Sequence, residues 1–226
     1  ISLGDCLNIN DSLIHATIGT PNFDIGHVFT DFGGGLAAFG VCQGPKAIAG
    51  TGLTNPVGDF FDVDYVCHEI GHQFTGNHTF NYCPGQGGVP VEPGSGTTIM
   101  AYAGLCGVNN VTTNTVDQFS VMSYDEMVNY THFGGGSCGQ QILTGNNIPI
   151  VNAGSEGFYI PKSTPFELIG SATDVDGDSL TYSWEQVDIG PNTTLAAPSG
   201  NCPLFKVNYP LNIPKRVFPP MSDIVT

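Results

Sequence analysis

The stretch that most constrains the fold and the chemistry of this chain is His68-Glu69-Ile70-Gly71-His72-Gln73-Phe74-Thr75-Gly76-Asn77-His78. It overlaps the end of residues 59–74, where apolar side chains recur at three- and four-residue steps, a spacing typical of an amphipathic helix. These apolar residues are Phe60, Val63, Val66, Cys67, Ile70 and Phe74. We predict Asp59 as the N-cap of this helix and Gly76 as its end.

The three histidines of this stretch predict a catalytic zinc site. His68 and His72 are four residues apart, so a helix presents both imidazoles on one face. We expect the chain to turn back after the helix, so that His78 reaches the same point. Three imidazoles plus one water form an open tetrahedral site, in which zinc lowers the pKa of the water toward about 7. Glu69 is placed to take a proton from that zinc-bound water as general base.

Composition excludes several classes of function. The chain has 226 residues, of which 40% are hydrophobic, so it can bury a core. Only 5 residues are Lys or Arg, against 20 Asp or Glu, and the formal net charge is −15. This charge argues against binding to nucleic acid or to an anionic lipid surface. No run of apolar residues is long enough for a membrane span. We expect a monomer with protein or peptide substrates.

The cysteines indicate an oxidising compartment. Seven Cys occur together with 31 Gly and 16 Pro, as in loop-rich secreted proteins. The odd number leaves at least one thiol without a partner in the chain. The chain begins at Ile1, with neither Met nor an apolar leader, so we expect a secreted protein processed from a longer precursor.

The chain divides into two parts that differ in composition. Residues 1–145 contain every His and six of the seven Cys, and a Gly- and Asn-rich joint separates them from residues 146–226. In the first part, residues 24–29 and 35–42 are predicted strands and residues 124–130 a predicted helix. In the second part, residues 165–170 and 179–185 alternate at period two around Asp174-Val175-Asp176-Gly177-Asp178. They predict a hairpin of a small β-sandwich, and the whole chain is predicted to be α+β.

The eleven-residue stretch resembles the zinc signature of the metzincin metallopeptidases. Its surroundings resemble the reprolysin (adamalysin)-like branch, in particular secreted peptidases of Bacteroidetes bacteria. The supporting stretches are residues 24–29, 34–42, 78–81 and 92–104. The resemblance implies a twisted sheet, a zinc-binding helix and a loop-rich C-terminal subdomain, with residues 146–226 as a cadherin- or PKD-like module. It also implies that the strand ending near Val41 lines the cleft and pairs with an extended peptide.

Two departures from the family pattern concern the fold. The family usually has Gly where this chain has Thr75, and a left-handed turn at a non-Gly residue costs roughly 1–2 kcal/mol. We therefore consider that Gly76 takes over the turn. The family's N-terminal subdomain also generally needs more chain before the zinc helix than the 67 residues present here, so it is either truncated or reduced.

Metzincins also place a Met in a tight turn beneath the zinc. Met100 and Met122 both stand in a suitable Met-x-Tyr context, and we favour Met100 because its surroundings and its shorter distance from His78 fit the family. The alternative for either is an ordinary core Met. Tyr102 is a candidate zinc-facing residue or transition-state donor, although reprolysin-like sites often omit this Tyr.

Several further residues carry weaker predictions. His27 is expected to be a packed structural residue. Cys67 is expected to form a disulfide, with Cys42 as a candidate, or to be a buried thiol. Cys83 with Cys106 and Cys138 with Cys202 are the other candidate pairs. The carboxylates of Asp174, Asp176 and Asp178 predict either a Ca²⁺ site or a solvated acidic turn.

The predicted function is that of a secreted zinc endopeptidase, with His68, His72 and His78 as ligands and Glu69 as the general base. The alternative is a catalytically inactive metzincin-like protein for adhesion or matrix binding, supported by Thr75 and the short N-terminal region. A storage or purely structural zinc site is less favoured, because three His ligands beside Glu69 leave the fourth position open.

Overall fold

The computed structural model describes residues 2–154 and 157–221, and the chain forms two compact units. Unit 1 comprises Ile1–Gln140 and Gln186–Val207, and unit 2 comprises Gln141–Glu185 and Asn208–Thr226. The division between the units thus differs from the single boundary expected at residue 145, because Gln186–Val207 belongs to unit 1. Asn81 Nδ2 donates to Pro191 O at 3.0 Å and Asn109 Oδ1 accepts from Leu195 N at 3.1 Å. A peptidase domain followed by a β-module stays a prediction.

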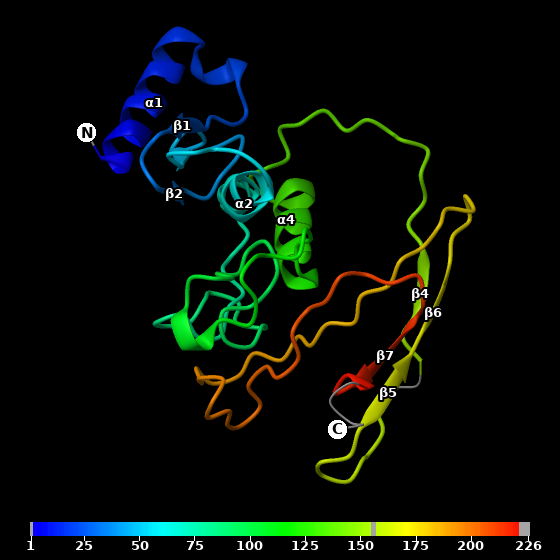
Figure 1. Ribbon diagram of the computed structural model, residues 1–226. Coiled ribbons are helices and arrows are strands. Elements are labelled where there is room, and N and C mark those ends of the chain that lie inside the picture. The colour runs from blue at the N-terminus through cyan, green and yellow to red at the C-terminus, as the bar shows by residue number, and fades with distance from the viewer. Residues whose placement is uncertain (1, 155–156, 222–226) are drawn as a thin grey trace. The chain divides into compact units, whose positions relative to one another are not determined.

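A small three-stranded sheet lies in the first part of unit 1. Its order is β1 (Val28–Thr30), β3 (Ala49–Gly52), β2 (Gly34–Ala37), with β1 parallel and β2 antiparallel to β3. Both β1 and β2 overlap the predicted strands, whereas β3 was not predicted. Helix α1 (Leu3–Thr17), also not predicted, packs on this sheet, with contacts to all three of its strands. Figure 1 shows it beside β1.

The helix predicted over residues 59–74 is confirmed. It consists of α2 (Asp59–Phe61), the π-helical segment η2 (Asp62–Cys67) and α3 (His68–Gln73) in direct succession. Gly58, not Asp59, is the N-cap. After α3 the chain turns at Thr75, whose φ is 72°, so the expectation that Gly76 makes the left-handed turn is wrong. Thr75, a non-Gly residue, therefore adopts a strained left-handed backbone conformation in this turn.

A second long helix packs beside the first one. Helix α4 (Val121–Phe133) extends the predicted 124–130 segment at both ends, and Ser120 caps it by accepting a hydrogen bond from Ser123 N. Met127 of α4 packs against Gly71 and Gly76. The helix lies next to α2 in Figure 1. Short 3₁₀ turns, η1 (Thr20–Asn22) and η3 (Gly107–Asn109), complete the helical elements of unit 1.

Two disulfides fix loops of unit 1. The predicted Cys83–Cys106 pair is confirmed. The second pair is Cys42–Cys138, so the candidate pairs Cys42–Cys67 and Cys138–Cys202 are both wrong. The thiol of Cys67 is free and half-buried, and Cys6 and Cys202 are also free. Tyr130, near the end of α4, donates to the carbonyl of Val41, the residue before Cys42, and this contact holds the chain that leads to Cys138 near Cys42.

The described residues of unit 2 form two separate two-stranded sheets. Strand β4 (Ile150–Asn152) pairs with β6 (Ser171–Thr173), and β5 (Phe166–Ile169) pairs with β7 (Lys215–Phe218). The predicted hairpin between residues 165–170 and 179–185 is therefore wrong, and the second segment contributes only an isolated bridge. Alternation at period two identified β5 but could not reveal its partner. No helix in the described part of the chain has the length and apolar character needed to cross a bilayer.

Candidate active site

The structure brings the three predicted histidines together at the end of the long helix. The Nε2 atom of His78 lies 3.2 Å from that of His68 and 2.9 Å from that of His72. His68 and His72 come from α3, and His78 reaches them because the chain turns back at Thr75. The first two imidazoles are buried and the third is half-buried.

Hydrogen bonds at the other ring nitrogens fix how these imidazoles can interact. His68 Nδ1 lies 2.6 Å from Ile99 O and His72 Nδ1 lies 2.7 Å from Gly76 O. A carbonyl oxygen only accepts, so each Nδ1 must carry the proton and each Nε2 must present its lone pair. A metal cation bound among the three Nε2 atoms would accept these lone pairs. This arrangement of a ligand and its carbonyl partner is the usual one for metal-binding His.

The spacing of the nitrogens and the electrostatics fit zinc. Tetrahedral zinc at the usual Zn–N distances separates its ligand nitrogens by about 3.3 Å. Burial, followed by the effect of the neighbouring His72, lowers the pKa of His68 to about 3. Burial, followed by the effect of His72, lowers the pKa of His78 to about 4. Burial also lowers the pKa of His72. All three side chains are therefore neutral and ready to donate lone pairs near pH 7.

Glu69 adds a carboxylate to this site. It is buried, its Oε2 has no hydrogen-bond partner among the described residues, and burial raises its pKa to about 7. Strand β2 approaches it closely, since a Cβ on Gly35 would lie 2.2 Å from Glu69 Oε1. Glycine at position 35 is thus what lets the sheet edge and this carboxylate share the site. A carboxyl group with a pKa near neutrality is suited to proton transfer.

Of the two candidate methionines, Met100 lies beneath the histidine helix. It is fully buried, and its Sδ would be 2.4 Å from a Cβ on Gly71, so glycine at position 71 makes room for it. It follows Ile99, whose carbonyl binds His68. Met122 is instead half-buried in the first turn of α4. The geometry therefore places Met100, and not Met122, beside the helix that carries the ligands.

Tyr102 borders the histidine cluster. Its ring centroid is 4.5 Å from that of His78 and 5.6 Å from that of His68. The pKa of its hydroxyl is raised by burial and then by the charge of Glu69. Tyr102 also separates two cavities that open at the edge strand β2.

These cavities lie at opposite ends of β2. One, of about 270 Å³, is lined by residues that include Leu36, Ala37, His72 and His78. The other, of about 220 Å³, is lined by residues that include Gly34 and His68. Both contain Gly35, Glu69 and Tyr102. An extended chain laid along β2 would therefore pass both cavities with Glu69 at its middle.

Two carboxylates that sequence reasoning missed hold the segment around His78. Glu126 of α4 accepts from Asn77 N at 2.9 Å and from Asn77 Nδ2. Glu92 is fully buried and accepts from Thr79 Oγ1 at 2.6 Å. No local pattern marks either residue, because each lies far in sequence from the segment it holds. Their only sequence signal is the acidic residue itself within an otherwise weakly charged region.

The other predicted candidates lie outside this site. His27 is a packed residue, as expected, with its ring nitrogens 3.0 Å from Gln73 Oε1 and 2.8 Å from Thr51 Oγ1. In unit 2, Asp174 Oδ1 accepts from the backbone N–H groups of Asp176 and Asp178. The three carboxylates lie close enough together to share a cation, with one oxygen of each within 4.8 Å of the others, so both the Ca²⁺ site and the solvated acidic turn stay predictions.

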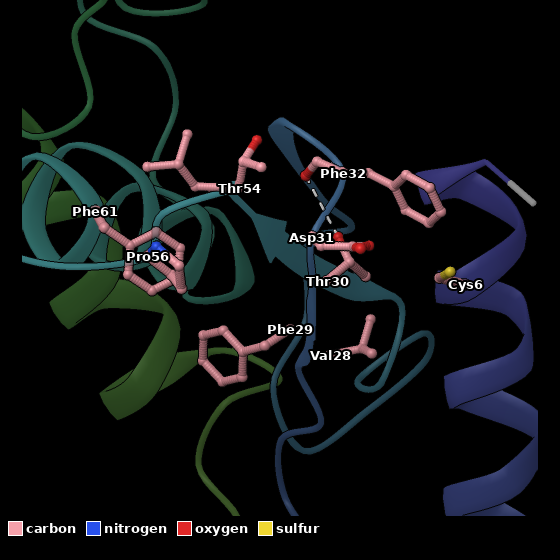
Figure 2. A pocket seen from close by; sticks show the side chains of 10 residues that line it. Cys6, Val28, Phe29, Thr30, Asp31, Phe32, Thr54, Pro56 and Phe61 are labelled. Carbon is pink, nitrogen blue, oxygen red and sulfur yellow. Dashed lines mark hydrogen bonds between the residues drawn. The ribbon is translucent and has the colours of Figure 1, made fainter.

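A groove of about 670 Å³ lies at the opposite edge of the sheet, along β1. Figure 2 shows that Val28, Phe29 and Phe61 contribute apolar side chains to it and that Cys6 of α1 lies at one side. It contains no imidazole and no second carboxylate beside Asp31. We assign no chemistry to this groove.

Comparison with known proteins agrees with this geometry. Residues 2–130 match the family described as metallo-peptidase family M12B, reprolysin-like, and the match includes all three histidines and Glu69. Neither the curated proteins nor the solved structures contain a match to the chain. The family match covers more than half of the sequence, and the chain therefore belongs to the reprolysin-like M12B metallopeptidases.

Proposed function

We propose that the chain is a secreted zinc endopeptidase of the bacterial reprolysin-like type. The observation that carries this proposal is the convergence of three imidazole Nε2 atoms beside the unpartnered carboxylate oxygen of Glu69. His68, His72 and His78 are the residues that would hold the metal. Zinc bound there would act as a Lewis acid toward a peptide carbonyl and would acidify a water molecule.

Glu69 performs the proton transfers in this proposal. Its carboxylate accepts a proton from the attacking water and then delivers it to the nitrogen of the leaving amine. Burial suits it to both steps, because a pKa of about 7 lets the group take up and release a proton near neutral pH. Tyr102, which borders His78, is the candidate donor to the oxygen that becomes negative in the transition state. Met100 serves as the methionine beneath the ligands.

The substrate is an extended segment of a protein chain. Strand β2 pairs with β3 on one side, and no other described strand pairs with its second side. A peptide can therefore add to β2 through backbone hydrogen bonds, with its side chains directed into the two flanking cavities. The two disulfides suit a protein that works outside the cell.

The inactive adhesion protein remains the alternative. Thr75 was one of its two supports, yet this residue adopts the left-handed turn itself and the ligand nitrogens still converge. Its other support is the short N-terminal region, and the described residues add no further one.

The test compares Glu69→Ala with the parent protein in a casein hydrolysis assay. We expect the variant to fold, to bind one equivalent of zinc and to lose about 100- to 10,000-fold in rate. Glu167→Gln is the matched control, because Glu167 makes only an exposed ion pair with Lys215 on β7. A chelator should abolish hydrolysis by the parent, and zinc should restore it. Undiminished cleavage by Glu69→Ala would refute the proposal.

A further inference from the structure

The cavity at the His68 end of β2 has a largely apolar wall, in which Asp64 is the one acidic residue besides Glu69. Ala101, Ala103 and Leu105 form one side and Phe60 and Tyr65 another. Asp64, from the segment η2, contributes a carboxylate. This cavity reaches the site through Glu69 and Tyr102, so a side chain that enters it belongs to a residue next to the scissile bond.

The carboxylate of Asp64 has only part of its hydrogen-bonding capacity filled. Its Oδ1 accepts from Thr115 N at 3.2 Å and from the Thr115 hydroxyl. Its Oδ2 is buried and has no partner among the described residues. Burial raises the pKa of Asp64, and the nearby charges of Asp117 and Asp59 raise it further. The ionised form therefore lacks a cation, and a cation brought in by a substrate would supply it.

The remaining walls suit the rest of a long basic side chain. The rings of Phe60 and Tyr65 meet edge to face with centroids 5.2 Å apart. Such walls pack against the alkyl stem of Lys or Arg, and aromatic faces attract the cationic head. A neutral apolar side chain would fill the same walls but would leave Asp64 without its counterion.

We propose that Asp64 makes this cavity a receptor for Lys or Arg, so that the enzyme prefers to cleave immediately before a basic residue. This inference rests on the proposed peptidase function and adds a substrate class to it. Asp64 acts here as a specificity-determining residue. The acidic field of Asp59 and Asp117 also favours the approach of basic segments.

The direction of the substrate follows from the order of the cavities along β2. The strand runs from Gly34 to Ala37, and the cavity with Asp64 lies at its Gly34 end. Antiparallel pairing is the commoner mode, and it is the mode in which β2 already pairs with β3. A peptide added in this way runs from Ala37 toward Gly34. The residue that follows the scissile bond therefore lies beside Asp64.

The experiment uses quenched fluorescent peptides that are identical except for the residue after the cleaved bond, which is Arg, citrulline or Leu. Citrulline keeps the shape of Arg without its charge. We expect the parent enzyme to prefer Arg over citrulline by about 30-fold or more in kcat/KM. Asp64→Asn should reduce this ratio to within about threefold, because the variant lacks the charge that distinguishes Arg from citrulline. Asn keeps an oxygen that can accept from Thr115, so the variant should fold.

Asp62→Asn is the matched control, since Asp62 is exposed on the same segment and does not line the cavity. It should retain the full preference for Arg. Mass spectrometry of the products should find Arg as the new N-terminal residue. Equal cleavage of all three peptides, a preference unchanged in Asp64→Asn, or Arg on the other side of the cleaved bond would overturn this inference alone. Absence of hydrolysis of casein and of every peptide would overturn the proposed function, and this inference with it.

Discussion

Replacing Glu92 with alanine should destabilise unit 1 by about 3 kcal/mol. Glu92 is 1% exposed, and its carboxylate accepts five hydrogen bonds. Thr97 N and Thr98 N donate to Oε2 at 2.7 and 3.1 Å, and the hydroxyls of Thr79, Thr97 and Thr98 supply the other three bonds. This carboxylate joins the residue after His78 to the segment that leads to Met100.

The magnitude comes mainly from the two backbone donors. Hydroxyl groups can rotate to other acceptors, and that of Thr97 already lies 3.0 Å from Val207 O. The N–H groups of Thr97 and Thr98 cannot rotate, and each buried donor without a partner costs about 1–3 kcal/mol. Their sum is about 2–6 kcal/mol, and water that enters the space left by the side chain places the loss in the lower half of this range.

Glu92→Gln is the matched control. Its carbonyl can accept from both N–H groups, and its amide can donate to the hydroxyls of Thr79 and Thr98, which also accept hydrogen bonds. We therefore expect a loss of only about 1 kcal/mol, from the weaker acceptor. Guanidinium unfolding, followed by far-UV circular dichroism, measures the free energy of unfolding of both variants with EDTA present and the disulfides intact. The two variants can be compared when the free energy depends on denaturant concentration with the same slope. A Glu92→Ala loss below about 0.5 kcal/mol, or an equal loss in both variants, would refute the reasoning.

Two further predictions concern the turn after α3 and the returning segment. Thr75→Gly should raise the free energy of unfolding by up to about 1 kcal/mol, because removal of left-handed strain exceeds the added entropy of the unfolded chain. Gly76→Ala should lower the free energy of unfolding in the same denaturation assay, because its Cβ would lie 2.6 Å from Met127 Cε. A lower free energy of unfolding in Thr75→Gly would contradict this account of the turn. Asn109→Ala should lower the free energy of unfolding by about 1–2 kcal/mol and should speed limited proteolysis within residues 186–207. Asn201→Ala, which removes only an exposed contact of 3.4 Å, should do neither. Equal effects of the two variants would contradict the role of Asn109 in holding this segment.

The fold was predictable from sequence only where its pattern is local. The long helix and β1, β2 and β5 carry periodic or glycine-bounded runs, and each lies where such a run predicts it. Strand β3 has the sequence Ala49-Gly50-Thr51-Gly52, without the bulky residues that signal a strand. Gly50 is required because a Cβ there would lie 2.7 Å from Val28 Cγ1 and 2.9 Å from Leu7 Cδ1. Close packing thus removed the sequence signal of this strand.

Helix α1 did carry a usable signal. Ser2 and Asp5 form a capping box, in which Asp5 N donates to Ser2 Oγ and Ser2 N donates to Asp5 Oδ2. This Ser-x-x-Asp pattern is readable from sequence. The pairing of β5 with β7, in contrast, joins residues far apart in the chain, and no periodicity within either strand specifies its partner.

The candidate site likewise has a part that local sequence patterns predict and a part that depends on contacts between distant residues. His68, Glu69 and His72 are placed by one helix, so their spacing alone predicts a shared face. Asp64 lies on the preceding segment of the same helix, but its role depends on Thr115 and Leu105, which only tertiary structure brings to it. The acidic residue was visible in the sequence, whereas the cavity around it was not.

Among the three proposed ligands, His78 is the one whose position depends most on distant residues. It follows a strained turn and belongs to no helix or strand, so no regular backbone pattern holds its ring. Instead, a carboxylate binds the residue on each side of it: Glu126 holds Asn77 and Glu92 holds Thr79. Two anchors on adjacent residues leave the intervening side chain little freedom to swing away from α3. The eleven-residue motif therefore predicts the third ligand, but the position of His78 is set by carboxylates that lie outside the motif.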